Sequence, residues 1–191
     1  MLSAIISTHE SERTLVPTLA ALVPGAATGL LAEVVIADAN SRDATAEVAD
    51  IAGCRFLTSS EPLGARLKAA AATTRSPWLL FLRAGATAQS GWIEATDHFI
   101  RTSSAVDGAP RAAVFRALDV TNYRRPRLAE IAALFVAALG APKPEQGLLI
   151  PRRLYDAIGG HADGENAEAA LLHKLGRRRI TLLPAAVTTA R

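Results

Sequence analysis

Short apolar runs alternate with stretches of helical periodicity over residues 3–82, and this alternation restricts the fold more than any other feature of the chain. Four runs rich in Ile, Val, Leu or Phe have the length of buried strands: Ser3–Ser7, Glu33–Ala37, Arg55–Leu57 and Trp78–Leu82. Three helical stretches separate them: Ser11–Val23, a helix that Asp43 caps and Gly53 ends, and Pro62–Thr74. The order β-α-β-α-β-α-β predicts an α/β fold of three layers, α/β/α, with a mainly parallel central sheet.

The second half of the chain is less regular, but strands and helices are still expected in it. The expected strands are Ala112–Asp119, Gly147–Ile150 and Ile180–Val187. The expected helices are Leu128–Leu139, Arg152–Ile158 and Glu165–Leu175, and the turn-rich stretches Arg101–Arg111 and Gly159–Glu165 are expected to be loops. Because no repeat or low-complexity linker divides its 191 residues, the chain is predicted to form a single domain.

Composition and charge argue against several classes of partner. The 21 basic and 18 acidic residues leave a net charge of +3, and the basic clusters Arg124–Arg127 and Arg177–Arg179 lack the interleaved aromatic residues of a nucleic-acid surface. The single cysteine, Cys54, cannot form an internal disulfide. The chain opens without a secretory pattern, and its longest apolar helix candidate, Ile131–Leu139, is too short to cross a bilayer. We expect no nucleic-acid partner, no transmembrane segment and a cytoplasmic location, with loose membrane association left open.

The carboxyl ends of the predicted strands are the places where a sheet of this kind binds ligands. These ends lie near Ser7–Thr8, Asp38, Ser59–Ser60 and Arg83. A carboxylate such as Asp38 can accept hydrogen bonds from a nucleobase or a ribose, and Asp43 can satisfy free amides at the start of the next helix. The same residues would also form an ordinary capped turn, so this stretch alone leaves both interpretations open.

Five stretches, taken together and in this order, resemble the family 2 glycosyltransferases, which have the GT-A fold, over almost the whole chain. They are Ala4–Glu10, Ile36–Thr45, Pro62–Arg66, Leu79–Leu82 with Gly91–Ile93, and Glu145–Ile150 with Gly159–Gly160. The resemblance implies a Rossmann-like GT-A domain, with residues 1–100 as its nucleotide-binding half and residues 101–191 as its acceptor-side half. It also implies that the ligand is a nucleotide sugar or a nucleoside diphosphate, and it leaves the acceptor unidentified.

The chain departs from the family's pattern where the family binds a divalent metal ion. Arg83-Ala84-Gly85 stands in place of the family's Asp-x-Asp motif, and Ala39 replaces one member of its first aspartate pair. Neither Arg83 nor Gly85 offers a side-chain oxygen, so the metal that the family uses has no predicted ligands here. An arginine at this place can instead donate two hydrogen bonds to a phosphate, or it can pair with Asp38 or face solvent.

The resemblance also assigns roles to individual residues. The substrate-binding residues that it implies are Thr8, Glu10, Asp38 and Gln146, and Arg83 is added to them as a possible donor to phosphate. The catalytic base that it implies is Glu165, since Gly164-Glu165-Asn166 keeps one carboxylate of the family's Glu-Asp pair, and Glu145 is the second candidate. Asp163 and His161 are weaker candidates.

Three functions are compatible with these features. The first is a glycosyltransferase that transfers a sugar from a nucleotide donor without a bound metal ion. The second is a catalytically inactive GT-A module that binds a nucleotide or a partner protein. The third is another doubly wound nucleotide-binding protein, because a fold alone does not determine a function.

Overall fold

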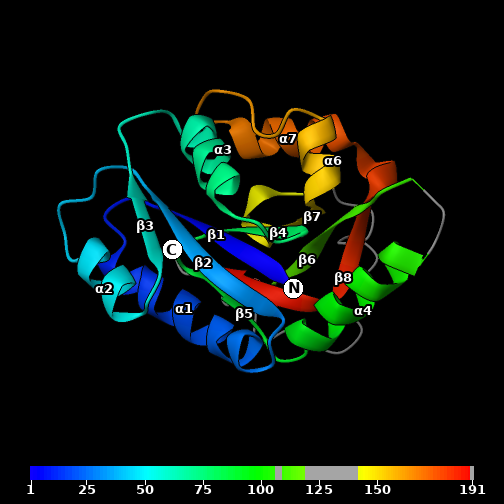
Figure 1. The fold of residues 1–191 in the computed structure, drawn as a ribbon, viewed down its shortest axis with the longest axis horizontal. Coiled ribbons are helices and arrows are strands. Elements are labelled where there is room, and N and C mark those ends of the chain that lie inside the picture. The colour runs from blue at the N-terminus through cyan, green and yellow to red at the C-terminus, as the bar shows by residue number, and fades with distance from the viewer. Residues whose placement is uncertain (106–108, 119–141, 190–191) are drawn as a thin grey trace.

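Eight strands in the described part of the chain form one sheet, and helices cover both of its faces (Figure 1). This computed structural model describes residues 1–105, 109–118 and 142–189. The strands lie in the order β3-β2-β1-β4-β7-β6-β8-β5. They are β1 Leu2–Thr8, β2 Leu31–Asp38, β3 Arg55–Thr58, β4 Trp78–Arg83, β5 Ala86–Ala88, β6 Ala112–Leu118, β7 Leu148–Pro151 and β8 Ile180–Thr189. The helices are α1 Glu12–Ala27, α2 Thr45–Ile51, α3 Leu63–Thr73, α4 Trp92–Ala105, α6 Arg152–Ala157 and α7 Ala167–Leu175, with 3-10 turns η2 Pro144–Gln146 and η3 Arg177–Arg179.

The sheet is mixed, with a parallel half and an antiparallel extension. β1 pairs in parallel with β2 and β4, and β2 pairs in parallel with β3, which confirms the parallel unit predicted from residues 3–82. β7 runs antiparallel to both β4 and β6, β6 and β8 are parallel, and β5 lies antiparallel to β8. The carboxyl ends of β1, β2, β3 and β4 therefore share one edge of the sheet.

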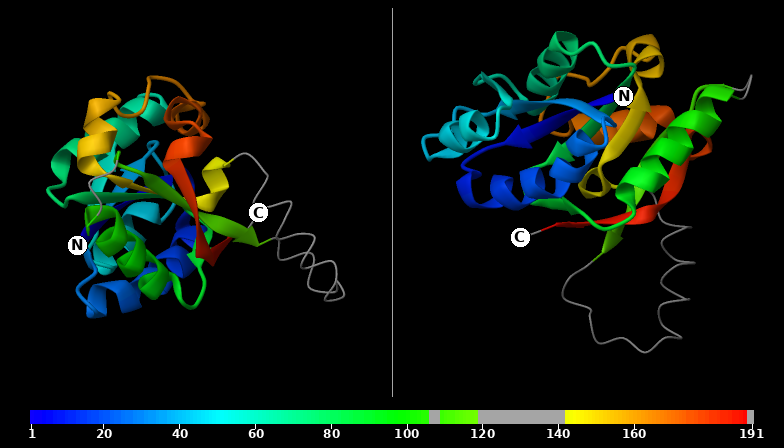
Figure 2. Two further views of the ribbon diagram at one scale, coloured as in Figure 1. Left: turned by 90° about the vertical axis from the view of Figure 1, so that its right-hand side faces the viewer. Right: turned by 60° about the horizontal axis from the view of Figure 1, so that its bottom comes forward.

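Two hydrophobic cores lie on opposite faces of the sheet. Helices α1 and α4 cover one face, and α3, α6 and α7 cover the other, as the side view in Figure 2 shows. Alternate residues of β4 divide between these cores: Trp78, Leu80 and Leu82 enter the first, and Leu79 and Phe81 enter the second. All five side chains are buried. This explains why β4 is an unbroken apolar run in the sequence rather than an alternating one.

The expected loop over Arg101–Arg111 is wrong in its first part, because α4 continues to Ala105. Helix α1 also runs past its predicted end at Val23 and reaches Ala27. Gly25, in this added turn, packs against Trp92 of α4 so closely that a Cβ atom would lie 2.4 Å from the indole. Tertiary packing thus outweighs the tendency of Pro24 to end the helix.

Most of the other predicted elements are confirmed to within a few residues at their ends. Strand β5 was not predicted, because three residues are too few for a periodic pattern. The expected helix Leu128–Leu139 lies outside the described residues. None of the described helices is both long and apolar enough to cross a membrane. The division into residues 1–100 and 101–191 stays a prediction.

Helix α3 approaches the loop before α7 without room for a side chain at Gly64. A Cβ atom on Gly64 would lie 1.8 Å from the carbonyl oxygen of Ala162 and 2.6 Å from Cβ of Ala167. The Gly64 amide donates a hydrogen bond of 3.1 Å to the carbonyl of Gly164. This contact fixes the loop, and with it the start of α7, against the edge of the sheet where β1 to β4 end.

Gly64→Ala is expected to lower the free energy of unfolding by about 1–3 kcal/mol, because the backbone of the loop must move to admit the methyl group. Urea unfolding followed by circular dichroism measures this change. Lys68→Ala, at an exposed position on the same helix, is the control and should shift the free energy by about 0.5 kcal/mol or less. Equal stability of Gly64→Ala and the wild type would contradict the close approach.

Candidate functional site at the carboxyl ends of β1, β2 and β4

The register of the parallel strands brings three predicted site residues to one edge of the sheet. Thr8 at the end of β1 pairs with Asp38 at the end of β2. Ser7 pairs with Arg83 at the end of β4, on the other side of β1. Thr8, Asp38 and Arg83 therefore lie at a common edge of the sheet. The pocket expected between them and their contacts with a ligand stay predictions.

The Asp38 carboxylate is fully buried and accepts four hydrogen bonds from the protein. Thr8 Oγ1 donates at 2.7 Å, the amide and hydroxyl of Ser41 donate at 2.8 and 2.6 Å, and Thr58 Oγ1 donates at 3.3 Å. Burial alone would raise the pKa of Asp38, but the hydrogen bonds from Ser41, Thr8 and Thr58 outweigh it and hold the pKa below its ordinary value. Asp38 thus organises the loop that follows β2.

The loop after β2 satisfies the amides at the start of α1. Ser41 Oγ accepts from the amide of Glu10 at 2.8 Å, Thr45 Oγ1 accepts from the amide of Ser11 at 2.9 Å, and Asp43 Oδ2 accepts from the amide of Glu12 at 2.9 Å. Asp43 also accepts from the amide of Thr45 at 3.0 Å, at the start of α2, although the N-cap residue of α2 is Ala44 and not Asp43 as predicted.

Glu10, a predicted substrate-binding residue, also belongs to this connection between two loops. Its exposed carboxylate accepts a hydrogen bond of 2.8 Å from the amide of Arg42. Glu10 and Asn40 have positive φ angles of 48° and 55°, which are costly for residues other than glycine. Such conformations persist where surrounding hydrogen bonds over-determine them, and they cluster at ligand sites.

Arg83 forms an ion pair with a carboxylate that the sequence analysis did not select. Nε donates to Glu168 Oε2 at 2.6 Å, and Nη2 donates to the same oxygen. Nη1 lies 3.7 Å from Glu145 Oε1. The side chain of Glu168 is 8% exposed, whereas those of Arg83 and Glu145 are 38% and 46% exposed. The alternative pairing of Arg83 with Asp38 is wrong, because Arg83 pairs with Glu168 and Glu145 instead.

Burial and charge act in opposite directions on this pair. Burial raises the pKa of Glu168, and Arg83 offsets only part of that rise. Burial would lower the pKa of Arg83, but Glu168 and Glu145 outweigh it and raise that pKa. Arg83 therefore stays a fixed positive charge at the end of β4.

Gln146 and Gly147 determine where Glu145 lies. Gln146 is buried; its Nε2 donates to the carbonyl of Phe115 at 2.8 Å, and its Oε1 accepts from the amide of Lys143 at 2.7 Å. Gly147 has φ of 69°, and a Cβ atom there would lie 2.7 Å from Leu82. These contacts hold η2 against the end of β4. The substrate contact predicted for Gln146 stays a prediction.

Glu165, the first candidate for the base, lies on the exposed loop before α7. Its Oε1 accepts a hydrogen bond of 3.3 Å from the amide of Leu63, at the start of α3. A carboxylate in this position is stabilised by the free amides of a helix N-terminus. The structure therefore joins Glu165 to α3, and it places Glu145 and not Glu165 beside Arg83.

His161 is buried beneath the same loop. Its ring packs edge-on against Phe81 with centroids 4.7 Å apart, and Nδ1 lies 2.9 Å from the Tyr155 hydroxyl. Within the described residues, Nε2 has no hydrogen-bond partner. Burial lowers the pKa of His161 to about 4, so the imidazole is neutral at pH 7.

The residues at the end of β4 do not fit a divalent metal ion. Arg83-Ala84-Gly85 offers no side-chain oxygen, and the Gly85 amide is occupied by Thr14 O and Thr18 Oγ1. In the described ranges, no group of three or more His, Cys, Asp or Glu residues could hold a metal. A guanidinium is the positive group that the chain itself supplies at this position.

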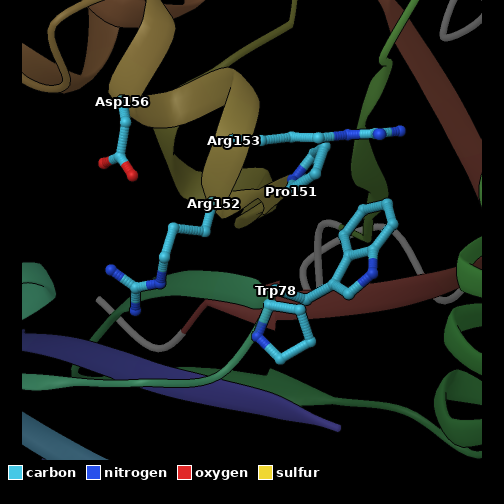
Figure 3. A pocket seen from close by; sticks show the side chains of 6 residues that line it. Trp78, Pro151, Arg152, Arg153 and Asp156 are labelled. Atoms are coloured by element: carbon cyan, nitrogen blue, oxygen red, sulfur yellow. The ribbon is translucent and has the colours of Figure 1, made fainter.

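A cavity lies on the opposite edge of the sheet, at the amino end of β4 (Figure 3). It has a volume of about 470 Å³ and is lined by Pro77, Trp78, Pro151, Arg152, Arg153 and Asp156. Figure 3 shows Arg152 and Arg153 extending in opposite directions. Arg152 is bound to the carbonyls of Ser76 and Ala71. The polar groups that line this cavity therefore do not point toward one common position, and the candidate site is assigned to the carboxyl edge of the sheet.

Comparison with known families and structures agrees with this fold. The model of the family described as Glycosyl transferase family 2 matches residues 3–135. No curated protein matches the chain. The structure is similar to S. aureus TarS 1-349 in complex with UDP-GlcNAc, with a TM-score of 0.74 and 16% identity over 100% of this chain and 58% of that chain.

A second similar structure is glucosyl-3-phosphoglycerate synthase from Mycobacterium tuberculosis in complex with Mn²⁺, uridine-diphosphate and glucosyl-3-phosphoglycerate. Its TM-score is 0.65 and its identity 18%, over 95% of this chain and 68% of that chain. At identities this low, the structural similarity shows a shared fold and nothing more. The chain spans less than two thirds of the TarS 1-349 structures, at 58% and 60%.

His161 should make the fold sensitive to mild acid. Its folded pKa of about 4 lies below the ordinary 6.5, so the unfolded chain binds its proton first as the pH falls. This contribution to stability is present above pH 6.5 and is lost between pH 6.5 and 4, by about 3 kcal/mol at most. Urea unfolding at pH 7 and at pH 4.5 should show a smaller loss for His161→Phe than for the wild type. His98→Gln, at an exposed position, should retain the wild-type loss, and an equal loss in His161→Phe would contradict the assignment.

Proposed function

Because the chain belongs to glycosyl transferase family 2, we propose that it binds a nucleotide sugar at the carboxyl ends of β1, β2 and β4 and transfers the sugar without a bound metal ion. The observation that carries this proposal is the placement of Arg83 at the end of β4, where Glu168 binds the Nε and Nη2 side of its guanidinium. Family membership also removes the third reading, an unrelated doubly wound nucleotide-binding protein. Structures of similar fold hold UDP-GlcNAc and uridine-diphosphate, which supports a uridine nucleotide as the first ligand to test.

The guanidinium of Arg83 retains free donors for a diphosphate. Glu168 occupies Nε and one N–H of Nη2, while Nη1 makes no hydrogen bond to a described residue. A guanidinium has five N–H groups in a planar fork, so a second anion can bind to the remaining end. As the bond between sugar and diphosphate breaks, negative charge grows on the phosphate oxygens, and a fixed positive group beside them stabilises it.

Glu145 is the better placed of the two proposed bases. It lies beside Arg83, whereas Glu165 caps α3. In the proposed reaction, the acceptor hydroxyl oxygen forms a bond to the anomeric carbon and gives its proton to the Glu145 carboxylate. The bond from that carbon to the diphosphate oxygen breaks, and its electron pair stays on the diphosphate. Glu145 would act as the general base of this step.

The two halves of the chain would both contribute to this site. Residues 1–100 supply Thr8, Asp38 and Arg83, and residues 101–191 supply Glu145 and Glu168. We propose that the first half holds the nucleotide and the second half the acceptor. Gln146 and Glu10 would support the site by holding η2 and the loop after β2, in addition to any contact with the substrate.

Nucleotide binding without sugar transfer is a second candidate function. One observation favours it: two carboxylates surround the single positive charge of Arg83. Incubation with UDP-sugars and analysis for released UDP separates the two candidates. Release of UDP on addition of an acceptor, or slowly to water, supports transfer, and binding without any release supports the inactive module.

Arg83→Ala is expected to weaken binding of UDP by roughly ten- to a hundredfold and to leave uridine binding unchanged. The reason is that charge-assisted hydrogen bonds of this kind contribute about 1.5–3 kcal/mol, and uridine lacks the phosphates that would receive them. Isothermal titration calorimetry measures both affinities. Arg101→Ala, which breaks an exposed ion pair on α4, is the control and should bind UDP as the wild type does.

The same titrations test metal independence. Mn²⁺ should not increase the affinity of the wild type for UDP beyond the value in EDTA. Tighter binding with Mn²⁺ would contradict the proposal, and so would an equal loss of UDP and uridine affinity in Arg83→Ala.

Asp38→Ala is expected to weaken UDP and uridine binding alike, by roughly ten- to a hundredfold, because the loop that Asp38 organises is proposed to hold the nucleoside. Ser41→Ala loosens the same loop and leaves the Asp38 carboxylate in place. An equal effect of the two changes indicates that Asp38 acts through the loop, and a larger effect of Asp38→Ala indicates direct contact. Unchanged affinity of Asp38→Ala in calorimetry would remove Asp38 from the binding site.

A further inference from the structure

Two carboxylates reach the guanidinium of Arg83, and their surroundings differ. Glu168 is buried on α7 and accepts two hydrogen bonds from Nε and Nη2. Glu145 is about half exposed on η2, and its Oε1 lies 3.7 Å from Nη1, which is beyond hydrogen-bonding distance. One carboxylate is thus a tight partner of Arg83 and the other a loose one.

We propose that Glu145 occupies the place on Arg83 that a diphosphate takes, so that ligand binding displaces Glu145 while Glu168 stays and orients the guanidinium. This inference rests on the proposed function, since it requires a diphosphate at Arg83. It makes Glu145 a competitor of the ligand and Glu168 a positioning residue. The two carboxylates should therefore have opposite effects on affinity.

Burial determines which of the two contacts opens. Moving Arg83 away from Glu168 would leave a buried carboxylate without its partner, and such unpaired charges are costly. Moving Glu145 away exposes a carboxylate that is already half in water, and ion pairs of that kind contribute little. A diphosphate that approaches from solvent therefore meets the free end of Arg83 after displacing only Glu145.

The displacement needs only a side-chain rotation. Gln146 fixes η2 through its hydrogen bonds to Phe115 and Lys143, and Gly147 packs closely against Leu82. Among described residues, the Glu145 carboxylate has no hydrogen-bond donor, so rotation away from Arg83 breaks only the long contact with Nη1. Once released from Arg83, the Glu145 carboxylate is free to accept the proton of an acceptor hydroxyl, as the proposed function requires.

The test is calorimetric titration of the full chain with UDP and with uridine. Glu145→Gln should bind UDP roughly two- to fivefold more tightly than the wild type, the range that a half-exposed ion pair is worth, and should bind uridine equally. Glu168→Gln should bind UDP several-fold more weakly. A thermal melt of each variant shows that it is folded, and the Glu145→Gln result decides the proposal even if Glu168→Gln is unstable.

Glu61→Gln is the matched control, because Glu61 is exposed on the loop after β3, at the same edge, without an ion pair to Arg83. An equal gain in Glu61→Gln would show a general charge effect and overturn the proposal. Unchanged or weaker UDP binding in Glu145→Gln, with Arg83 still required for UDP binding, would overturn it and leave the proposed function intact. Failure of the wild type to bind UDP would overturn both.

Glu145→Gln should also separate binding from turnover. With a UDP-sugar that the wild type cleaves, the variant should show a lower KM and a lower kcat, because the competitor and the base are lost together. A lower KM with an unchanged kcat would support the displacement of Glu145 by the diphosphate and would show that Glu145 is not the base.

Discussion

The ion pair between Arg83 and Glu168 is the interaction on which the candidate site depends. It joins the end of β4 to the first turn of α7, two elements far apart in the sequence. Glu168 is buried on the apolar face of α7, where a carboxylate without a cation would be strongly destabilising. Arg83 in turn is kept at the end of the strand and prevented from extending freely into solvent. Each residue therefore explains the position of the other.

An arginine at the end of β4 changes the electrostatics of a family 2 site in a specific way. It supplies one positive charge on a covalently attached fork, whereas a divalent ion supplies two charges and an adjustable set of coordination positions. Glu168 and Glu145 both oppose the positive charge of Arg83, so a diphosphate must displace one of them to interact fully with that charge. Exposure selects Glu145, and this asymmetry gives the site a ligand-free and a ligand-bound arrangement.

Much of the fold could be predicted from the sequence because β1, β2 and β4 are mostly buried and appear as apolar runs with helices between them. The ends of those runs also located Thr8, Asp38 and Arg83. Residues whose roles depend on tertiary contacts could not be located in this way. Glu165 accepts a hydrogen bond from the start of α3, and Gln146 bonds to the backbone of β6 and of Lys143. Glu168 did leave a signal. It lies three and four residues before Leu171 and Leu172, on the buried face of α7, and a carboxylate on such a face requires a partner.

Whether Arg83 takes the place of the metal ion is best tested by a crystal structure of the chain with UDP, grown with Mn²⁺ and measured at a wavelength where manganese scatters anomalously. We expect the terminal phosphate to lie within hydrogen-bonding distance of Arg83, Glu168 to retain its contact with Nε, and no anomalous peak to lie beside the diphosphate. A manganese peak that bridges the phosphates and the protein, with Arg83 turned away from them, would contradict the claim that arginine takes the place of the metal ion.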